Sequence, residues 1–210
     1  MSKWIVAAFV LGAAPAAWGQ NPGVFDPDSN PFGESYGDWG ADWWTWAAAI
    51  PLSESPVADT TGAFCAADQD GPVWFLAGSF GSTVERTCTI PGGKALFFPL
   101  LNRVCAKPGN GNGDAMIACA SLPPETVVEM DASIDGVPLV DLIDYRGTSD
   151  IFSLTWALGR NKPKFYDLAA SDGYWLMLEP LSAGTHTVHF HGLRTSGFEL
   201  DVTYHLTVTP

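Results

Sequence analysis

Basic residues are scarce in this 210-residue chain. It has 10 Lys and Arg against 23 Asp and Glu, and its formal net charge at pH 7 is −13. Nucleic-acid binding depends on neutralising phosphates with Lys and Arg, so a surface of this charge repels polyanions. The same repulsion disfavours anionic membrane surfaces. We therefore expect no nucleic-acid partner and a ligand that is neutral or cationic.

Long uncharged apolar segments are also missing beyond the first twenty residues. The apolar run over residues 4–17 follows Lys3 and precedes the small-x-small step Ala17-Trp18-Gly19, which is the pattern of a secretory signal peptide. The run is shorter than the ~20 apolar residues that span a bilayer, although an uncleaved membrane anchor is the alternative. We expect residues 1–19 to be cleaved, leaving a secreted or periplasmic bacterial protein that does not insert into a membrane.

Catalytic signatures are absent as well. The sequence contains no G-x-S-x-G elbow, no H-E-x-x-H, no P-loop and no G-x-G-x-x-G. A glycosidase with paired carboxylates would leave no local pattern, because its two acids need only meet in space. Whether the protein is an enzyme therefore stays open at the level of sequence.

Four cysteines are present: Cys65, Cys88, Cys105 and Cys119. In an oxidising compartment an even number favours two disulfides, for which three connectivities are possible. We favour the sequential pairs Cys65–Cys88 and Cys105–Cys119, because each closes a short loop around a predicted hairpin or turn. A zinc site is the alternative, but the spacing has no C-x2-C element.

About 190 residues would remain after cleavage, which suits one domain. Residues 20–34 are rich in Pro, Gly, Asn and Asp and show no periodicity, so we expect a flexible N-terminal segment. Residues 35–210 would form the single domain. Its one strong helix candidate covers residues 35–50, where Ser35 begins a capping box and tryptophans recur at helical spacing before Pro51.

The rest of the chain has the pattern of short strands. One segment alternates over residues 83–90, and the Asp135-Gly136 step suits a two-residue hairpin turn. Arg86 falls on the apolar side of its strand, so we expect a carboxylate partner such as Asp59 or Asp150. The predicted fold is all-β, a β-sandwich of the jelly-roll or immunoglobulin kind with the Trp-rich helix docked on it. The expected strands cover residues 73–80, 83–90, 94–101, 132–134, 137–143, 151–158, 173–178, 185–191 and 198–208.

Several longer strings suggest a family. W-x3-WW-x-W (39–46), VWFLAG (73–78), PGGKALFFPLLN (91–102) and DGYWLMLEPLSAGTH (172–186) resemble a family of uncharacterised secreted bacterial proteins. The resemblance covers most of the chain after the signal peptide. It implies a bacterial extracellular or periplasmic setting and carries no activity or catalytic residue.

A cluster of histidines and acids marks the C-terminal hairpin. Alternation places His189 and His191 on the outward face of one strand, and Glu199 and Asp201 on the outward face of the next. Two imidazoles and two carboxylates could bind a divalent metal, which is the cofactor we consider. Solvated His–carboxylate pairs are the simpler interpretation, and a one-residue register slip would remove the cluster.

The tryptophans give a second candidate site. Exposed rings can bind sugars, so Trp39, Trp43 and Trp44 are candidate ligand contacts for a polysaccharide or another cell-envelope component. An aromatic stripe at helical spacing is more often core. The acidic turn Asp68-Gln69-Asp70-Gly71 begins like a calcium loop, but position 79 is serine where an EF-hand needs Glu. A binding module is the leading hypothesis, and a metal-binding protein or metal-dependent enzyme is the alternative.

Overall fold

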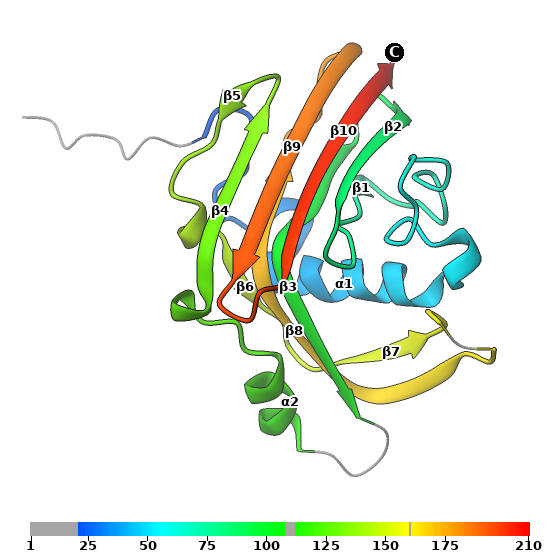
Figure 1. Cartoon of the computed structure of the whole chain (residues 1–210), viewed down its shortest axis with the longest axis vertical. Helices are drawn as coiled ribbons and strands as arrows, with labels where there is room; N and C mark the ends of the chain where they lie inside the picture. Colours follow the sequence, from blue (N-terminus) through cyan, green and yellow to red (C-terminus); the bar gives the residue numbers. More distant parts are fainter. Residues whose placement is uncertain (1–20, 108–111, 160) are drawn as a thin grey trace, which may run out of the picture.

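The protein is a β-sandwich with a helix packed on one side (Figure 1). The computed structural model describes residues 21–107, 112–159 and 161–210. The predicted signal peptide lies outside the described residues. No helix in the described part of the chain is long and apolar enough to cross a membrane.

Each of the two sheets has five strands. We call the sheet with order β1-β3-β8-β6, on which β7 also pairs with β8, sheet A, and the sheet with order β2-β10-β9-β4-β5 sheet B. The strands of sheet A are β1 (Val73–Phe75), β3 (Ala95–Lys107), β6 (Arg146–Thr148), β7 (Phe152–Trp156) and β8 (Lys164–Leu178). Those of sheet B are β2 (Thr83–Pro91), β4 (Val127–Ile134), β5 (Val137–Pro138), β9 (Gly184–Arg194) and β10 (Glu199–Thr209).

The burial pattern of each sheet follows from its neighbours. In β2 exposed and buried residues alternate along the whole strand, because one face of sheet B meets solvent. In β3 and β8 long runs are buried continuously, because sheet A lies between sheet B and α1 (Tyr36–Ala49). Phe98 stacks on Phe190 between the sheets, whereas Phe97 stacks on Trp175.

Helix α1 begins at the predicted cap. The Ser35 side chain accepts a hydrogen bond from the Asp38 backbone N–H at 3.2 Å. Its interior glycines have a packing reason: a Cβ on Gly37 would lie 2.1 Å from the Thr148 carbonyl oxygen, and one on Gly40 would lie 2.9 Å from the Trp175 ring. The helix therefore sits closer to sheet A than side chains at these positions would allow.

Both predicted disulfides are confirmed. Cys65–Cys88 ties the long loop after α1 to β2, and Cys105–Cys119 ties α2 (Gly113–Ala120) to β3. The two loops that they close span 23 and 14 residues. In the chain-entropy model, each disulfide stabilises the folded protein by roughly 3 kcal/mol, because it restricts the unfolded chain.

Some elements differ from the sequence-based expectation. The strand expected over residues 137–143 ends at Pro138 as the short β5, and a 3-10 turn forms at Leu142–Asp144. The short helix α2, which lies outside the one predicted helix, is capped by Asn112, whose side chain accepts from the Asp114 N–H. Residues 21–34 were expected to be a flexible segment, yet Val24 forms a bridge with Leu178 and is 8% exposed. The Asp135-Gly136 hairpin turn is present, with both residues at positive φ.

Arg86 corrects one prediction. Its side chain is buried, but its partner is neither the Asp59 nor the Asp150 carboxylate. The guanidinium donates to four backbone carbonyls and to the Tyr204 hydroxyl. The carbonyls belong to Val57, Asp59, Ala77 and Gly78. Their partial charges replace the carboxylate, so Arg86 joins two loops to the core of sheet B.

The edge of β3 is only partly covered. β1 pairs with β3 over Ala95, Leu96 and Phe97, while β8 pairs with β3 on its other side as far as Lys107. Beyond Phe97, the side of β3 toward β1 has no strand partner among the described residues. The register of β3 shifts between Pro99 and Leu101, and Pro99 lies where the strand has an open edge, a position that tolerates a residue without an N–H.

Candidate functional site

The histidines and acids of the C-terminal hairpin meet on the solvent-facing side of sheet B. His189 Nε2 lies 2.9 Å from Asp201 Oδ1, and His191 Nε2 lies 3.2 Å from Glu199 Oε1. The four side chains therefore share the outward face that alternation predicts. His191 lies directly opposite Asp201 and reaches Glu199 diagonally.

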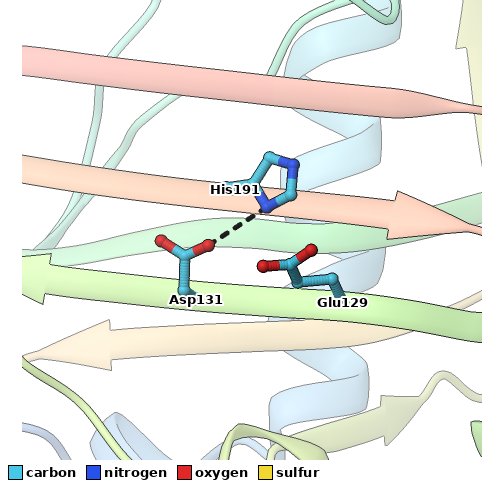
Figure 2. A group of neighbouring side chains, drawn as sticks. All are labelled: Glu129, Asp131 and His191. Carbon is cyan, nitrogen blue, oxygen red and sulfur yellow. Dashed lines mark hydrogen bonds and ion pairs between the residues drawn. The ribbon is translucent and has the colours of Figure 1, made fainter.

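Sequence reasoning missed the third strand of this cluster. β4 brings Asp131 opposite His191, with Glu129 two residues before it (Figure 2). His191 Nδ1 lies 3.1 Å from Asp131 Oδ2, and His189 Nδ1 lies 3.5 Å from Asp131 Oδ1. Glu129, Asp131 and His191 each offer one atom that could ligate a metal ion, and these three atoms lie within 4.8 Å of one another. No local sequence signal links β4 to β9, since about 60 residues separate them.

Protons compete with a metal for this cluster. Burial lowers the pKa of His191, but the hydrogen bond with Glu199 and the charge of Asp131 outweigh it, so the pKa is raised. A protonated His191 donates from both ring nitrogens to these two carboxylates. A metal ion would need the neutral ring. The geometry therefore suits an ion pair network at acidic pH and a metal ligand set at higher pH.

The three candidate tryptophans separate into two clefts. Trp43 and Trp44 line a cleft of about 300 Å³ between α1, the open edge of β3, the loop after β1 and the start of β10. We call this the Arg103 cleft. Trp39 instead lines a cleft of about 400 Å³ on another side of α1, together with Asp42, Asp68 and Asp70. We call this the Asp cleft, and it holds the turn that resembles a calcium loop.

The Arg103 cleft is predominantly aromatic and apolar. Trp44 stacks on Trp156 with ring centroids 6.1 Å apart, and Phe80 is 59% exposed at the rim. The whole lining is Trp43, Trp44, Val57, Gly78, Ser79, Phe80, Pro99, Asn102, Arg103, Val104, Trp156, Leu158, Phe198 and Leu200. Small-molecule sites are typically apolar pockets of ~300–1,000 Å³ with a few polar groups that orient the ligand.

Two hydrogen-bond donors in the wall of this cleft lack partners. The indole Nε1 of Trp44 and the amide Nδ2 of Asn102 are buried and bond to no described atom. A buried polar group left unpaired costs ~1–3 kcal/mol. The neighbouring Trp43 shows the usual arrangement, since its Nε1 donates to the Leu76 carbonyl at 3.0 Å. Both atoms are fully buried, so these unpaired donors lie inside the wall and out of reach of a ligand in the cleft.

Comparisons with family models, with curated proteins and with solved structures gave no match. The resemblance to secreted bacterial proteins of unknown activity thus rests on the sequence motifs and stays a prediction.

Proposed function

We propose that this protein is a secreted or periplasmic binding module whose ligand occupies the Arg103 cleft. The observation that carries the proposal is the combination of exposed and stacked aromatic rings beside Arg103 in one concave surface. A sugar ring of a polysaccharide or envelope component suits it, because the apolar face of the sugar packs on an aromatic ring while hydroxyl oxygens accept hydrogen bonds.

The proposed location outside the cytoplasm rests on two features. Two disulfides join all four cysteines of the chain. Such bonds persist outside the reducing cytosol. The signal-peptide pattern at residues 1–19 also indicates that the chain is exported. Retention of the chain in the cytoplasm of the producing cell, shown by fractionation, would contradict the proposed location.

Glycan binding tests the function. Isothermal titration with cell-wall oligosaccharides should show saturable binding, and Phe80→Ala should weaken it by roughly fivefold, equivalent to ~1 kcal/mol of lost contact. Phe165→Ala is the matched control, because Phe165 is 62% exposed and lies outside the cleft. Equal effects of the two changes, or no binding by the intact protein, would contradict the proposal.

The cluster of Glu129, Asp131 and His191 favours a second candidate function, divalent metal binding. Imidazole and carboxylate together suit Zn²⁺ or Cu²⁺. Protein purified without a His tag should bind one equivalent of Zn²⁺ at pH 8, and His191→Ala should abolish binding. His205→Ala is the control, because His205 pairs with Glu85 on the same sheet face and lies outside the cluster. Absence of stoichiometric metal at pH 8 would remove this candidate.

A further inference from the structure

We infer that the ligand of the Arg103 cleft carries a carboxylate, as a uronic-acid unit of an acidic polysaccharide does, and that Arg103 recognises it. This inference rests on the proposed function of the same cleft and adds the chemical class of the ligand. It also departs from the neutral or cationic ligand that the net charge of −13 predicts. The reason is that the charges around this cleft differ in sign from those of the whole protein.

The lining of the cleft contains one basic residue and no acidic residue. Arg103 is exposed there and forms no ion pair with any described residue, although the chain has more than twice as many acids as bases. Arg146 is a useful contrast, since its guanidinium lies 2.6 Å from the buried Asp172 carboxylate. Arg103 is thus free to bind a carboxylate from outside, in the bidentate geometry that guanidinium groups favour.

Two further cations lie close to the same wall. Arg194 of β9 is desolvated and also feels the charge of Arg103, and both effects lower its pKa. Arg86 lies behind the wall, because it donates to the carbonyls of Val57 and Gly78, two residues of the lining. None of the hydrogen bonds of Arg86 goes to a carboxylate. The cleft therefore has positive charges around it and no carboxylate in its lining.

Aromatic rings lie in the same lining as Arg103. The stacked Trp44 and Trp156 and the exposed Phe80 supply flat apolar surface in the cleft. A uronic-acid ring offers the two complementary features: an apolar face for the rings and a carboxylate for the guanidinium.

The acidic surface elsewhere does not exclude such a ligand. Exposed charges are screened beyond ~8 Å at physiological ionic strength, so distant carboxylates contribute little inside the cleft. At low salt their repulsion extends further, and it should slow the approach of an anionic ligand. Binding measured at 0.15 M salt is therefore the relevant condition.

Matched oligosaccharides test the inference. Trimers of galacturonate, glucuronate and mannuronate would be titrated into the intact protein beside their neutral methyl esters at 0.15 M salt. We expect at least one acid to bind roughly tenfold more tightly than its ester, the difference that a charge-assisted hydrogen bond supplies. Arg103→Gln should reduce the affinity for that acid to the level of the ester. Lys107→Gln is the control, because it removes a positive charge from the same strand outside the cleft.

The outcomes separate this inference from the proposed function. If ester and acid bind equally and Phe80→Ala weakens both, the carboxylate inference is wrong while the cleft remains the binding site. If an acid binds but neither Phe80→Ala nor Arg103→Gln weakens it, both are wrong. If no trimer binds, the inference is overturned, and the neutral glycans of the preceding titration decide the function alone.

Discussion

The Arg103 cleft and the Asp cleft lie beside the same helix and share an aromatic composition, yet they are chemically opposite. In the Asp cleft the indole N–H groups are satisfied, since Trp39 donates to the Pro31 carbonyl and Trp46 to the Ala67 carbonyl. In the Arg103 cleft Trp44 has no acceptor. The Asp cleft is lined by three aspartates and no base, whereas the Arg103 cleft is lined by one arginine and no acid.

Most of this difference comes from the segments that face the helix, since α1 itself contributes only Asp42 to the charges of the two clefts. Helical spacing gives α1 tryptophans on more than one side, and the residues opposite each ring decide its environment. The acids Asp68 and Asp70 arrive on the loop after α1, and Arg103 arrives on the open part of β3. Ring type and periodicity alone therefore do not distinguish a core tryptophan from one that contacts a ligand.

The largest effect is expected from a substitution that displaces α1, the helix that lines both clefts. In Gly37→Ala the new methyl group would meet the Thr148 carbonyl oxygen, so α1 must move away from sheet A. We expect a loss of about 3 kcal/mol in the free energy of unfolding. An alanine free of this contact would instead stabilise a helix by ~1 kcal/mol. Urea denaturation distinguishes the two cases by sign, and a stabilised variant would contradict the close approach.

A smaller difference in stability is expected between one substitution in each cleft. Trp39→Phe removes the donor of a 2.9 Å hydrogen bond to the buried Pro31 carbonyl, which keeps only the longer bond from the Glu34 N–H at 3.4 Å. Trp44→Phe removes a donor that has no partner. We expect Trp39→Phe to cost ~1–2 kcal/mol more than Trp44→Phe, since both changes remove the same ring atoms. Thermal and urea unfolding of the two variants provide the comparison. Equal losses would show that Trp44 Nε1 has an acceptor in solution.

The smallest effect concerns the acids beside the Asp cleft. Partial burial raises the pKa values of Glu34 and Asp42, and their mutual proximity and that of Asp38 add to the shift of Glu34. A carboxyl whose pKa is raised on folding stabilises the protein while protonated, and this stability is lost as the pH rises through the folded pKa. Asp42→Asn should therefore gain stability relative to the native chain between pH 4 and pH 7.

The Arg103 cleft supplies the control for this pH dependence. Asn102→Ala changes no titrating group, so its stability relative to the native chain should not vary with pH over the same range. Unfolding curves at pH 3, 5 and 7 for the three proteins provide the measurement. A constant difference between Asp42→Asn and the native chain would contradict the raised pKa.

Local patterns predicted most of the fold. Ser35 capped its helix, β2 alternated, and the Asp135-Gly136 turn and both disulfides followed from residues close in sequence. Long-range partners could not be predicted. Asp131 completes the histidine cluster from a strand with no sequence link to β9, and Arg86 found backbone carbonyls where a carboxylate was expected. Such contacts depend on which elements become neighbours in space.

The uncovered edge of β3 has a consequence for the protein at high concentration. A free strand edge can pair with another chain and start aggregation. Here Pro99 offers no N–H, the adjacent shift in register bends the strand, and the charged Arg103 and Lys107 follow along it. These features discourage self-association at the edge, so the neighbouring cleft stays open to solvent while the molecules remain apart.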